Sequence, residues 1–375
     1  MQNSSIRDTR FGLLITLFTL GLVTALIFIP SHFRSEAGNT GEGLFTRTNS
    51  ADPSLPNYDI RTAKEVGLDE FFSSARQAVR KDAALIADVR DGFVRGEEDL
   101  RSRIPTVKVE YNEDIRTPEV ITPDVWKANI EWLTPPSSLR RAEILRNFVK
   151  ENNSLAGVDD AQADALTVLS DYTNPDGNLS YAHLEQRING VPVFRGEVKA
   201  GFTKDGRIIR VINNLAPGLD YESLSTDFRN PTDALKAAAR HINFELPSTE
   251  VSRNDAASTD LKTVFGRGGD WASTAEKMYF PTEPGVAVPA WRVLIWQPVN
   301  AYYVIVDAAS GTMLWRKNIS EDQTQAATYN VYRNANAYID VADSPAPLSP
   351  GPIDPTLGTQ GAIISRANVT LIGNE

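Results

Sequence analysis

Apolar residues recur mainly three, four or seven positions apart in four parts of this 375-residue chain, and this spacing predicts amphipathic helices. The four parts are residues 62–96, 139–152, 159–170 and 231–242. Gly92 and Gly96 are expected to end the first helix, because glycine is disfavoured inside helices and common at their ends. Asn230 followed by Pro231 predicts the start of the last one, since it combines a capping side chain with a residue whose φ suits the first turn.

Elsewhere the apolar residues alternate with a period of two, which predicts strands. An extended piece is predicted at residues 106–111, and three alternating runs lie within residues 179–215, joined by the hairpin signals Asn189-Gly190 and Asp205-Gly206. Four more runs lie within residues 276–318. A helix followed by an antiparallel meander thus occurs twice. The predicted fold class is α+β with two related halves, after an N-terminal export helix and a helical segment.

The N-terminal part contains a segment that is predicted to enter a membrane. Residues 11–29 are uncharged and almost wholly apolar, and they follow Arg7 and Arg10. The run is long enough for a retained anchor, yet residues 35–37 have the small-x-small pattern that signal peptidases accept. A cleaved signal peptide and a membrane anchor both stay open. In either case the residues after 37 are expected to be secreted or extracytoplasmic.

The composition of the connecting segments divides the chain further, because residues 35–58 are rich in Gly, Ser, Thr, Asn and Pro and the residues after 319 are polar and rich in proline. The predicted organisation is a signal peptide or membrane anchor (1–37), a linker (38–61), a helical and Pro-rich region (62–136), a first helix-and-sheet domain (137–219), a second one (230–319), and an extended Pro-rich connector with the truncated start of a following domain (320–375).

Composition and charge exclude several classes of function. The chain has no cysteine, which excludes thiol nucleophiles, thiolate metal sites and disulfides. Its net charge of −10 and pI near 5.0 argue against a basic face for nucleic acid. Hydrophobic residues make up 41% of the chain, which is typical of a folded protein.

The sequence predicts no catalytic, cofactor-binding or metal-ligating residue, and no cofactor. His32, His183 and His241 are far apart and no H-E-x-x-H pair is present, which favours packing or surface roles for them. Gly266–Gly269 lacks the context of a phosphate loop. The paired acids Glu97-Glu98 and Asp159-Asp160 are interpreted as solvated helix ends.

Aromatic residues also gather in the later strands, where alternating aromatic side chains are expected to form core rather than a sugar or peptide site. They are Trp291, Trp296, Tyr302, Tyr303 and Trp315.

Two segments resemble a known family. Residues 179–215 resemble the fungalysin/thermolysin propeptide (FTP) module through a G-x-P-V-F-x-G-E step from Gly190 to Glu197 and through the turn at Lys204-Asp205-Gly206. Residues 288–324 resemble the PepSY-type domain that follows it in such proregions, with a V-D-A-x-S/T-G turn at Val306–Gly311. Two shorter segments, residues 55–61 and 344–352, are similar to bacterial secreted fungalysin-like precursors.

The resemblance implies a proregion, which is a domain that assists the folding of its protease and blocks the active-site cleft until it is cut away. Family members continue into a zinc protease domain with H-E-x-x-H, which this chain lacks, so no enzymatic activity is implied for it. The expected partner is a zinc metalloprotease catalytic domain, which the chain inhibits and chaperones without covalent attachment. Edge strands that can accept a partner strand fit this expectation. The alternative is a free-standing, envelope-anchored binding or regulatory module.

Overall fold

The computed structural model describes residues 54–65, 67–177, 179–298, 300–320, 327–332 and 366–371. The segment predicted to enter a membrane, residues 11–29, lies outside the described residues. Within these ranges no helix combines the length and the apolar character needed to span a bilayer.

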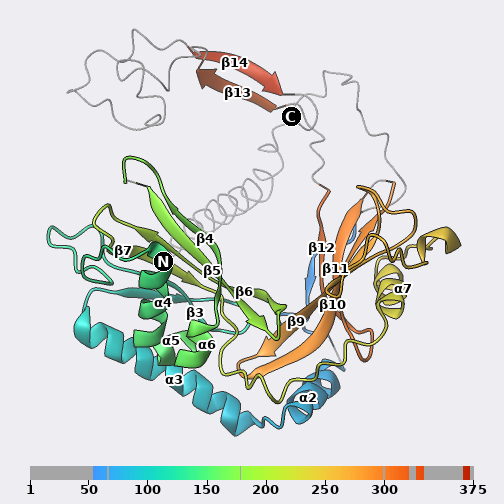
Figure 1. Ribbon diagram of the computed structural model, residues 1–375, viewed down its shortest axis with the longest axis horizontal. Helices are drawn as coiled ribbons and strands as arrows, with labels where there is room; N and C mark the ends of the chain where they lie inside the picture. The colour runs from blue at the N-terminus through green and yellow to red at the C-terminus, as the bar shows by residue number, and fades with distance from the viewer. Residues whose placement is uncertain are drawn as a thin grey trace, which may run out of the picture. The chain divides into compact units, whose positions relative to one another are not determined.

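The described chain contains both helices and strands (Figure 1). The helices are α2 (Leu68–Ala78), α3 (Ala83–Arg103), α4 (Arg141–Glu151), α5 (Asn153–Ala156), α6 (Asp160–Asp164), α7 (Pro231–His241) and a short 3-10 helix, η1 (Ser248–Glu250). A first strand set consists of β2 (Lys108–Tyr111), β3 (Pro118–Thr122), β4 (Thr167–Thr173), β5 (Ser180–Ile188), β6 (Val191–Phe202) and β7 (Ile208–Asn213). A second strand set consists of β1 (Tyr58–Asp59), β8 (Lys262–Val264), β9 (Thr274–Glu283), β10 (Val286–Trp296), β11 (Ala301–Asp307) and β12 (Met313–Asn318).

These strands form one sheet of 12 strands. The first strand set runs in the order β4-β5-β6-β7-β3-β2, and the second runs β1-β12-β11-β10-β9, with β8 also paired to β9. Pairing is antiparallel within both sets, and the sets are joined by the parallel pairing of Val193 in β6 with Tyr279 in β9. The mixed α+β prediction is therefore confirmed. That the two strand sets are related repeats stays a prediction.

A separate antiparallel pair is formed by β13 (Ala327–Tyr332) and β14 (Arg366–Leu371), in which Ala327 lies opposite Leu371. Both strands lie within residues 320–375, which were predicted to hold an extended connector and the start of a following domain.

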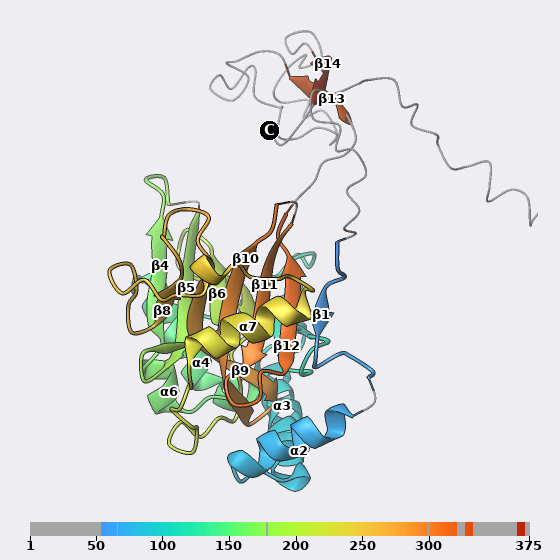
Figure 2. The ribbon, with the colours of Figure 1, turned by 90° about the vertical axis from the view of Figure 1, so that its right-hand side faces the viewer.

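Helices cover a face of each strand set. α4 contacts β4, β5 and β6, while α7 contacts β9 to β12 and lies across the second strand set in Figure 2. α3 runs along the base of both sets in Figure 1, with Ile86 in the core of the second set and Leu100 in the core of the first. As predicted, α7 begins with Pro231 in its first turn, and the side chain of Asn230 accepts a hydrogen bond from the Thr232 amide at 2.9 Å.

Two hydrophobic cores fill these layers, and β6 contributes to both. Val191 and Val193 lie in the core beneath α7, whereas Val198 and Phe202 lie in the core beneath α4. The strand passes from one core to the other at Arg195. Because one strand supplies both cores, a displacement of either strand set along β6 would expose apolar side chains in both.

The predicted first helix, over residues 62–96, was wrong in its extent. The chain forms two helices there, and Gly92 and Gly96 lie inside α3 rather than at a helix end. The break between the helices is set by Asp82, whose side chain accepts a hydrogen bond from the Leu85 amide at 2.9 Å. Gly96 has another role, since a Cβ atom there would lie 2.5 Å from the backbone nitrogen of Leu155 in α5.

Two other predicted segments also differ from the structure. The helix expected over residues 159–170 ends at Asp164, and residues 167–173 form β4 instead, because pairing with β5 outweighs an apolar pattern that suits either period. The last residues of the predicted 38–61 linker belong to the sheet. Tyr58 and Asp59 form β1, and the Ile60 side chain is 1% exposed.

A pair of glycine substitutions in α3 tests the close contact between α3 and α5. We expect Gly96→Ala to lower the free energy of unfolding by about 1–3 kcal/mol, because the new methyl group overlaps the backbone of Leu155. Gly92→Ala is the matched control, since its nearest contact would be 3.8 Å. Its effect should be a gain of about 0.5–1 kcal/mol from the helix preference of alanine. Urea unfolding measures both, and equal effects would contradict the contact.

Candidate functional site

The described residues hold no group of three or more His, Asp or Glu side chains placed to bind a metal ion. The imidazole rings of both histidines in these ranges have a polar partner: His183 Nε2 lies 2.7 Å from a Glu197 carboxylate oxygen, and His241 Nε2 lies 2.9 Å from the Gly311 carbonyl oxygen. His32 lies outside the described residues.

The glycine-rich stretch and the paired acids considered in the sequence analysis have structural roles. Gly266–Gly269 lies in a turn region between β8 and β9, and Asp159 caps α6. The interpretation of Glu97 as a helix end was wrong, because it lies within α3, where it accepts hydrogen bonds from Arg101 at 2.7 Å and from the Tyr111 hydroxyl at 2.7 Å.

The aromatic set is divided between the core and the surface. Trp291 and Tyr302 are 2% and 1% exposed, and Trp291 donates a hydrogen bond to the Phe228 carbonyl. The remaining three are half-buried: Trp296, Tyr303 and Trp315. The core interpretation therefore holds for Trp291 and Tyr302, and also for Trp315, which packs against the same core.

The G-x-P-V-F-x-G-E step lies where the two strand sets meet, and we call residues 190–197 the junction. Its Val193 makes the parallel pairing to Tyr279 of the second set. The Phe194 ring stacks on that of Phe280, with ring centroids 5.0 Å apart, and lies 5.3 Å from that of Trp315. The step thus supplies the contacts that join the first strand set to the second.

The backbone changes direction within the junction. Arg195 has φ of 54°, in the left-handed region, and the pairing of β5 with β6 shifts register between Glu185 and Arg187. A Cβ at Gly196 would lie 2.7 Å from the Val193 Cβ and 3.1 Å from the Gln186 side-chain oxygen. Only glycine fits here without displacing its neighbours.

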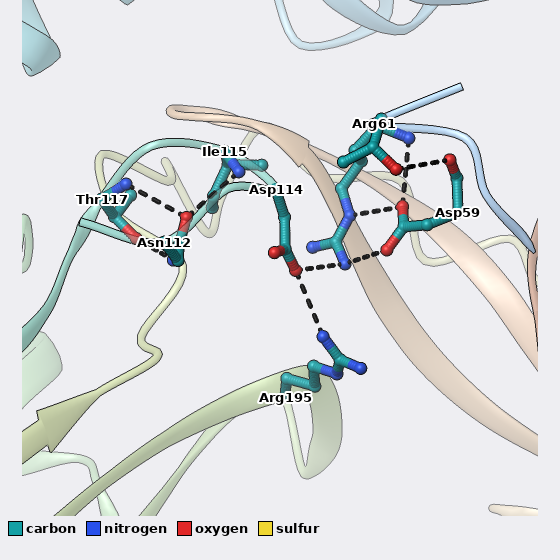
Figure 3. Close-up of polar contacts among 8 residues, drawn as sticks. Asp59, Arg61, Asn112, Asp114, Ile115, Thr117 and Arg195 are labelled. Carbon is teal, nitrogen blue, oxygen red and sulfur yellow. Dashed lines mark hydrogen bonds and ion pairs between the residues drawn. The ribbon is translucent and has the colours of Figure 1, made fainter. Parts of the chain in front are cut away.

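A buried charge network fixes the junction to two other segments (Figure 3). The Arg61 side chain is 3% exposed, and its Nη2 lies 2.6 Å from a carboxylate oxygen of Asp59 and 2.6 Å from one of Asp114. Arg195 reaches the same Asp114 oxygen at 3.2 Å. The Arg61 guanidinium also lies 5.0 Å from the ring centroid of Phe280. The network ties the segment around β1 and the β2–β3 loop to β6.

Asp114 is held in place by its own loop. The Asn112 side-chain oxygen accepts hydrogen bonds from the amides of Ile115 at 3.2 Å and Thr117 at 3.3 Å, and its nitrogen donates to the Thr117 hydroxyl at 2.7 Å (Figure 3). Thr117 itself is buried. The loop therefore presents the Asp114 carboxylate to Arg61 and Arg195.

Beside this network lies a cleft of about 1210 Å³. Its walls come from α2, from the β2–β3 loop and from Glu283, which forms an ion pair with Arg76 at 2.6 Å. Lys64, Arg90 and Arg116 add positive charge to the same cleft, and Asp69 and Glu113 add negative charge. Its mixed charge suits a polypeptide segment better than an anionic cofactor.

A second polar cluster lies on the face of the first strand set opposite to α4, at the end of the junction. Glu197 accepts a hydrogen bond from Lys199 Nζ at 2.5 Å and lies 2.7 Å from His183 Nε2. Burial is the largest influence on the Glu197 carboxyl and by itself raises its pKa. The hydrogen bonds from Lys199 and His183 together outweigh burial, so the pKa of Glu197 lies below its ordinary value of 4.5.

Comparison with known protein families gives a match over the part of the chain that contains the junction. Residues 164–215 match the Fungalysin/Thermolysin Propeptide Motif. The match spans β4 to β7 and therefore contains the whole junction. This match supports the resemblance of residues 179–215 to the propeptide module.

Similar curated proteins are fungal extracellular metalloproteinases. Extracellular metalloproteinase mep of Aspergillus terreus is 25% identical over 169 residues, covering 44% of this chain and 26% of that protein. Extracellular metalloproteinase 1 of Phaeosphaeria nodorum is 25% identical over 197 residues, covering 52% and 30%. Extracellular metalloproteinase 10 of Uncinocarpus reesii is 27% identical over 173 residues, covering 44% and 26%. The chain thus spans between a quarter and a third of the length of these relatives.

Among solved structures, the C-terminal domain of Bacillus megaterium YpeB is similar to 60% of this chain and 96% of its own, at 11% identity and a TM-score of 0.22.

Sequence reasoning found the junction motif but missed the charge network around it. Arg61 and Asp114 lie far apart in sequence, and neither belongs to a periodic pattern. Residues 55–61 are similar to secreted precursors, but residues 38–61 were predicted to be a linker, so the sequence did not assign Arg61 a structural role.

Replacing Arg61 by methionine tests the charge network. We expect Arg61→Met to lower the free energy of unfolding by about 3 kcal/mol, because it removes a cation buried between two carboxylates. The matched control is Arg95→Met, whose pair with Asp88 spans 3.7 Å between side chains that are 62% and 77% exposed. The control should change stability by less than about 1 kcal/mol. Denaturant unfolding measures both, and a small effect at Arg61 would contradict a structural role for the network.

The Glu197 cluster predicts a specific loss of stability in acid. Because the pKa of Glu197 is lower in the folded state than in the unfolded chain, the cluster stabilises the protein above pH 4.5 and this contribution is lost as the pH falls below it. Glu197→Gln should therefore make the decline of unfolding free energy below pH 4.5 shallower. The control Glu222→Gln, at an exposed position, should leave the decline as in the wild type. Identical pH profiles for the wild type and Glu197→Gln would refute the assignment.

Proposed function

We propose that this chain is the proregion of an exported zinc metalloprotease precursor, and that it acts as a non-covalent inhibitor and folding chaperone of a fungalysin/thermolysin-like catalytic domain. The observation that carries the proposal is the propeptide motif match at residues 164–215, which spans the junction where the strand sets meet. The motif is therefore part of the framework of the folded chain.

The relatives support the same function. The three compared above are extracellular metalloproteinases, and the matched regions cover 26 to 30% of their lengths. Most of each relative therefore lies beyond the region shared with this chain, which leaves room for a catalytic domain. The apolar segment at residues 11–29 fits export through a membrane, either as a cleaved signal peptide or as an anchor.

The proposed organisation places an FTP-like domain over residues 137–219 and a PepSY-like domain over residues 230–319. The motif match lies inside the first of these ranges. No catalytic or zinc-binding role is proposed for any residue of this chain, because the zinc would belong to the partner.

The fold offers a physical route to inhibition. β6 and the Arg61 network join the two strand sets, so the surface offered to a protease is largely formed before binding. Binding to such a surface avoids much of the entropy that ordering a flexible partner would cost. The same preformed surface can stabilise native-like forms of the catalytic domain while it folds.

Inhibition and refolding assays test the proposal. The purified chain is mixed with a purified thermolysin-type catalytic domain, and we expect inhibition at micromolar or lower concentration together with a higher yield of active enzyme after refolding. Serum albumin at equal mass is the control for non-specific protection and for competition as a substrate. Full protease activity and an unchanged refolding yield would contradict the proposal.

A further inference from the structure

In the described part of the sheet, four strands pair on one side only: β1, β2, β4 and β8. Three of them are short or carry charge, as exposed edges of soluble proteins usually do. β1 has two residues, β8 has three and contains Lys262, and β2 has four and contains Lys108 and Glu110. β4 has seven residues, and Asp171 is its one charged side chain.

The side chains of β4 are also unusually exposed for their apolar character. Val168, Leu169 and Tyr172 are 44%, 48% and 43% exposed. Next to them, Leu179 and Tyr181 are 59% and 44% exposed, and the Tyr181 ring lies 5.5 Å from that of Tyr172. We call residues 167–173 together with Leu179 and Tyr181 the β4 edge.

An open apolar edge of this length invites pairing with another chain, and natural proteins normally block it. β4 has a register shift between Val168 and Ser170, where Leu169 is left without a partner residue in β5. This irregularity hinders the edge-to-edge pairing of many chains into a long sheet. The backbone on either side of it can still form hydrogen bonds with an added strand. An edge of this kind is suited to one specific strand.

We propose that the β4 edge binds an extended segment of the protease catalytic domain by strand addition, an inference that rests on the function proposed above. β4 lies within the residues that match the propeptide motif. In the metalloproteinase relatives at least 70% of the length lies beyond the matched region, and that remainder is the source of the strand.

The chemistry of the edge defines the strand that fits. Backbone hydrogen bonds supply affinity, and alternate side chains supply specificity. Apolar side chains in the added strand would pack best against the exposed side chains of Val168, Leu169 and Tyr172. Asp171, the one charged side chain of β4, disfavours an acidic residue opposite it. A second copy of this chain is a poorer occupant, because each copy carries a net charge of −10.

Lysine substitution on the β4 edge tests the inference. The equilibrium dissociation constant of a purified thermolysin-type catalytic domain is measured for the wild-type chain, for Leu169→Lys and for Val94→Lys. Val94 is the matched control, since it is an aliphatic residue of α3 that is 53% exposed. We expect Leu169→Lys to raise the dissociation constant at least about tenfold and Val94→Lys to change it less than about twofold.

Hydrogen exchange on the wild-type complex gives an independent measurement that needs no variant. Amides of β4 should exchange more slowly when the protease domain is bound, while those of the β2 edge stay unchanged. Unchanged β4 amides, or equal affinities for the wild type and Leu169→Lys, would overturn the β4 assignment and leave the proregion function intact.

Two further outcomes are distinct from these. A wild-type chain that neither binds nor inhibits the protease domain would overturn the proposed function, and the β4 assignment with it. A wild-type dimer in sedimentation that Leu169→Lys converts to a monomer would show a second copy on this edge, which would also overturn the assignment.

Discussion

Strand β6 passes from one hydrophobic core into the other, and the rest of the structure depends on the few residues where it does so. Val193 and Phe194 face the second core, and Val198 faces the first. Between them, Gly196 lets the backbone pack against Val193 and Gln186 at distances that no other residue allows. The propeptide motif match, residues 164–215, contains this passage.

The charge network around Arg61 strengthens the same place. A buried arginine between two carboxylates brings a desolvation cost, which good geometry and further hydrogen bonds can offset. Here Asp59 precedes α2, Asp114 lies in the β2–β3 loop and Arg195 lies in β6, so three separate segments must be in place for the network to form. It selects one arrangement of the strand sets, which is useful to a chain proposed to bind its partner as a preformed surface.

Much of the fold could be predicted from local pattern. The Asn189-Gly190 hairpin, the capped start at Asn230 and the alternating strands of both meanders follow from turn chemistry and periodicity. What could not be predicted depends on contacts between distant residues. Gly96 was predicted to end a helix, but it is needed where Leu155 approaches α3 closely. Residues 167–170 were predicted to be helical, but they lie in β4 and pair with β5. Asp114 meets Arg61 only through tertiary structure, and the exposure of the β4 edge depends on the order of strands.

The most direct test of the junction is amide hydrogen exchange on Gly196→Ala, with Gly201→Ala as control. Both glycines lie in β6, but a Cβ at Gly201 would meet no atom within 4 Å. If the junction couples the two cores, Gly196→Ala should reduce protection in both α4 and α7, and Gly201→Ala should reduce it in neither. Loss of protection confined to the first strand set and α4, or equal behaviour of the two variants, would contradict the account.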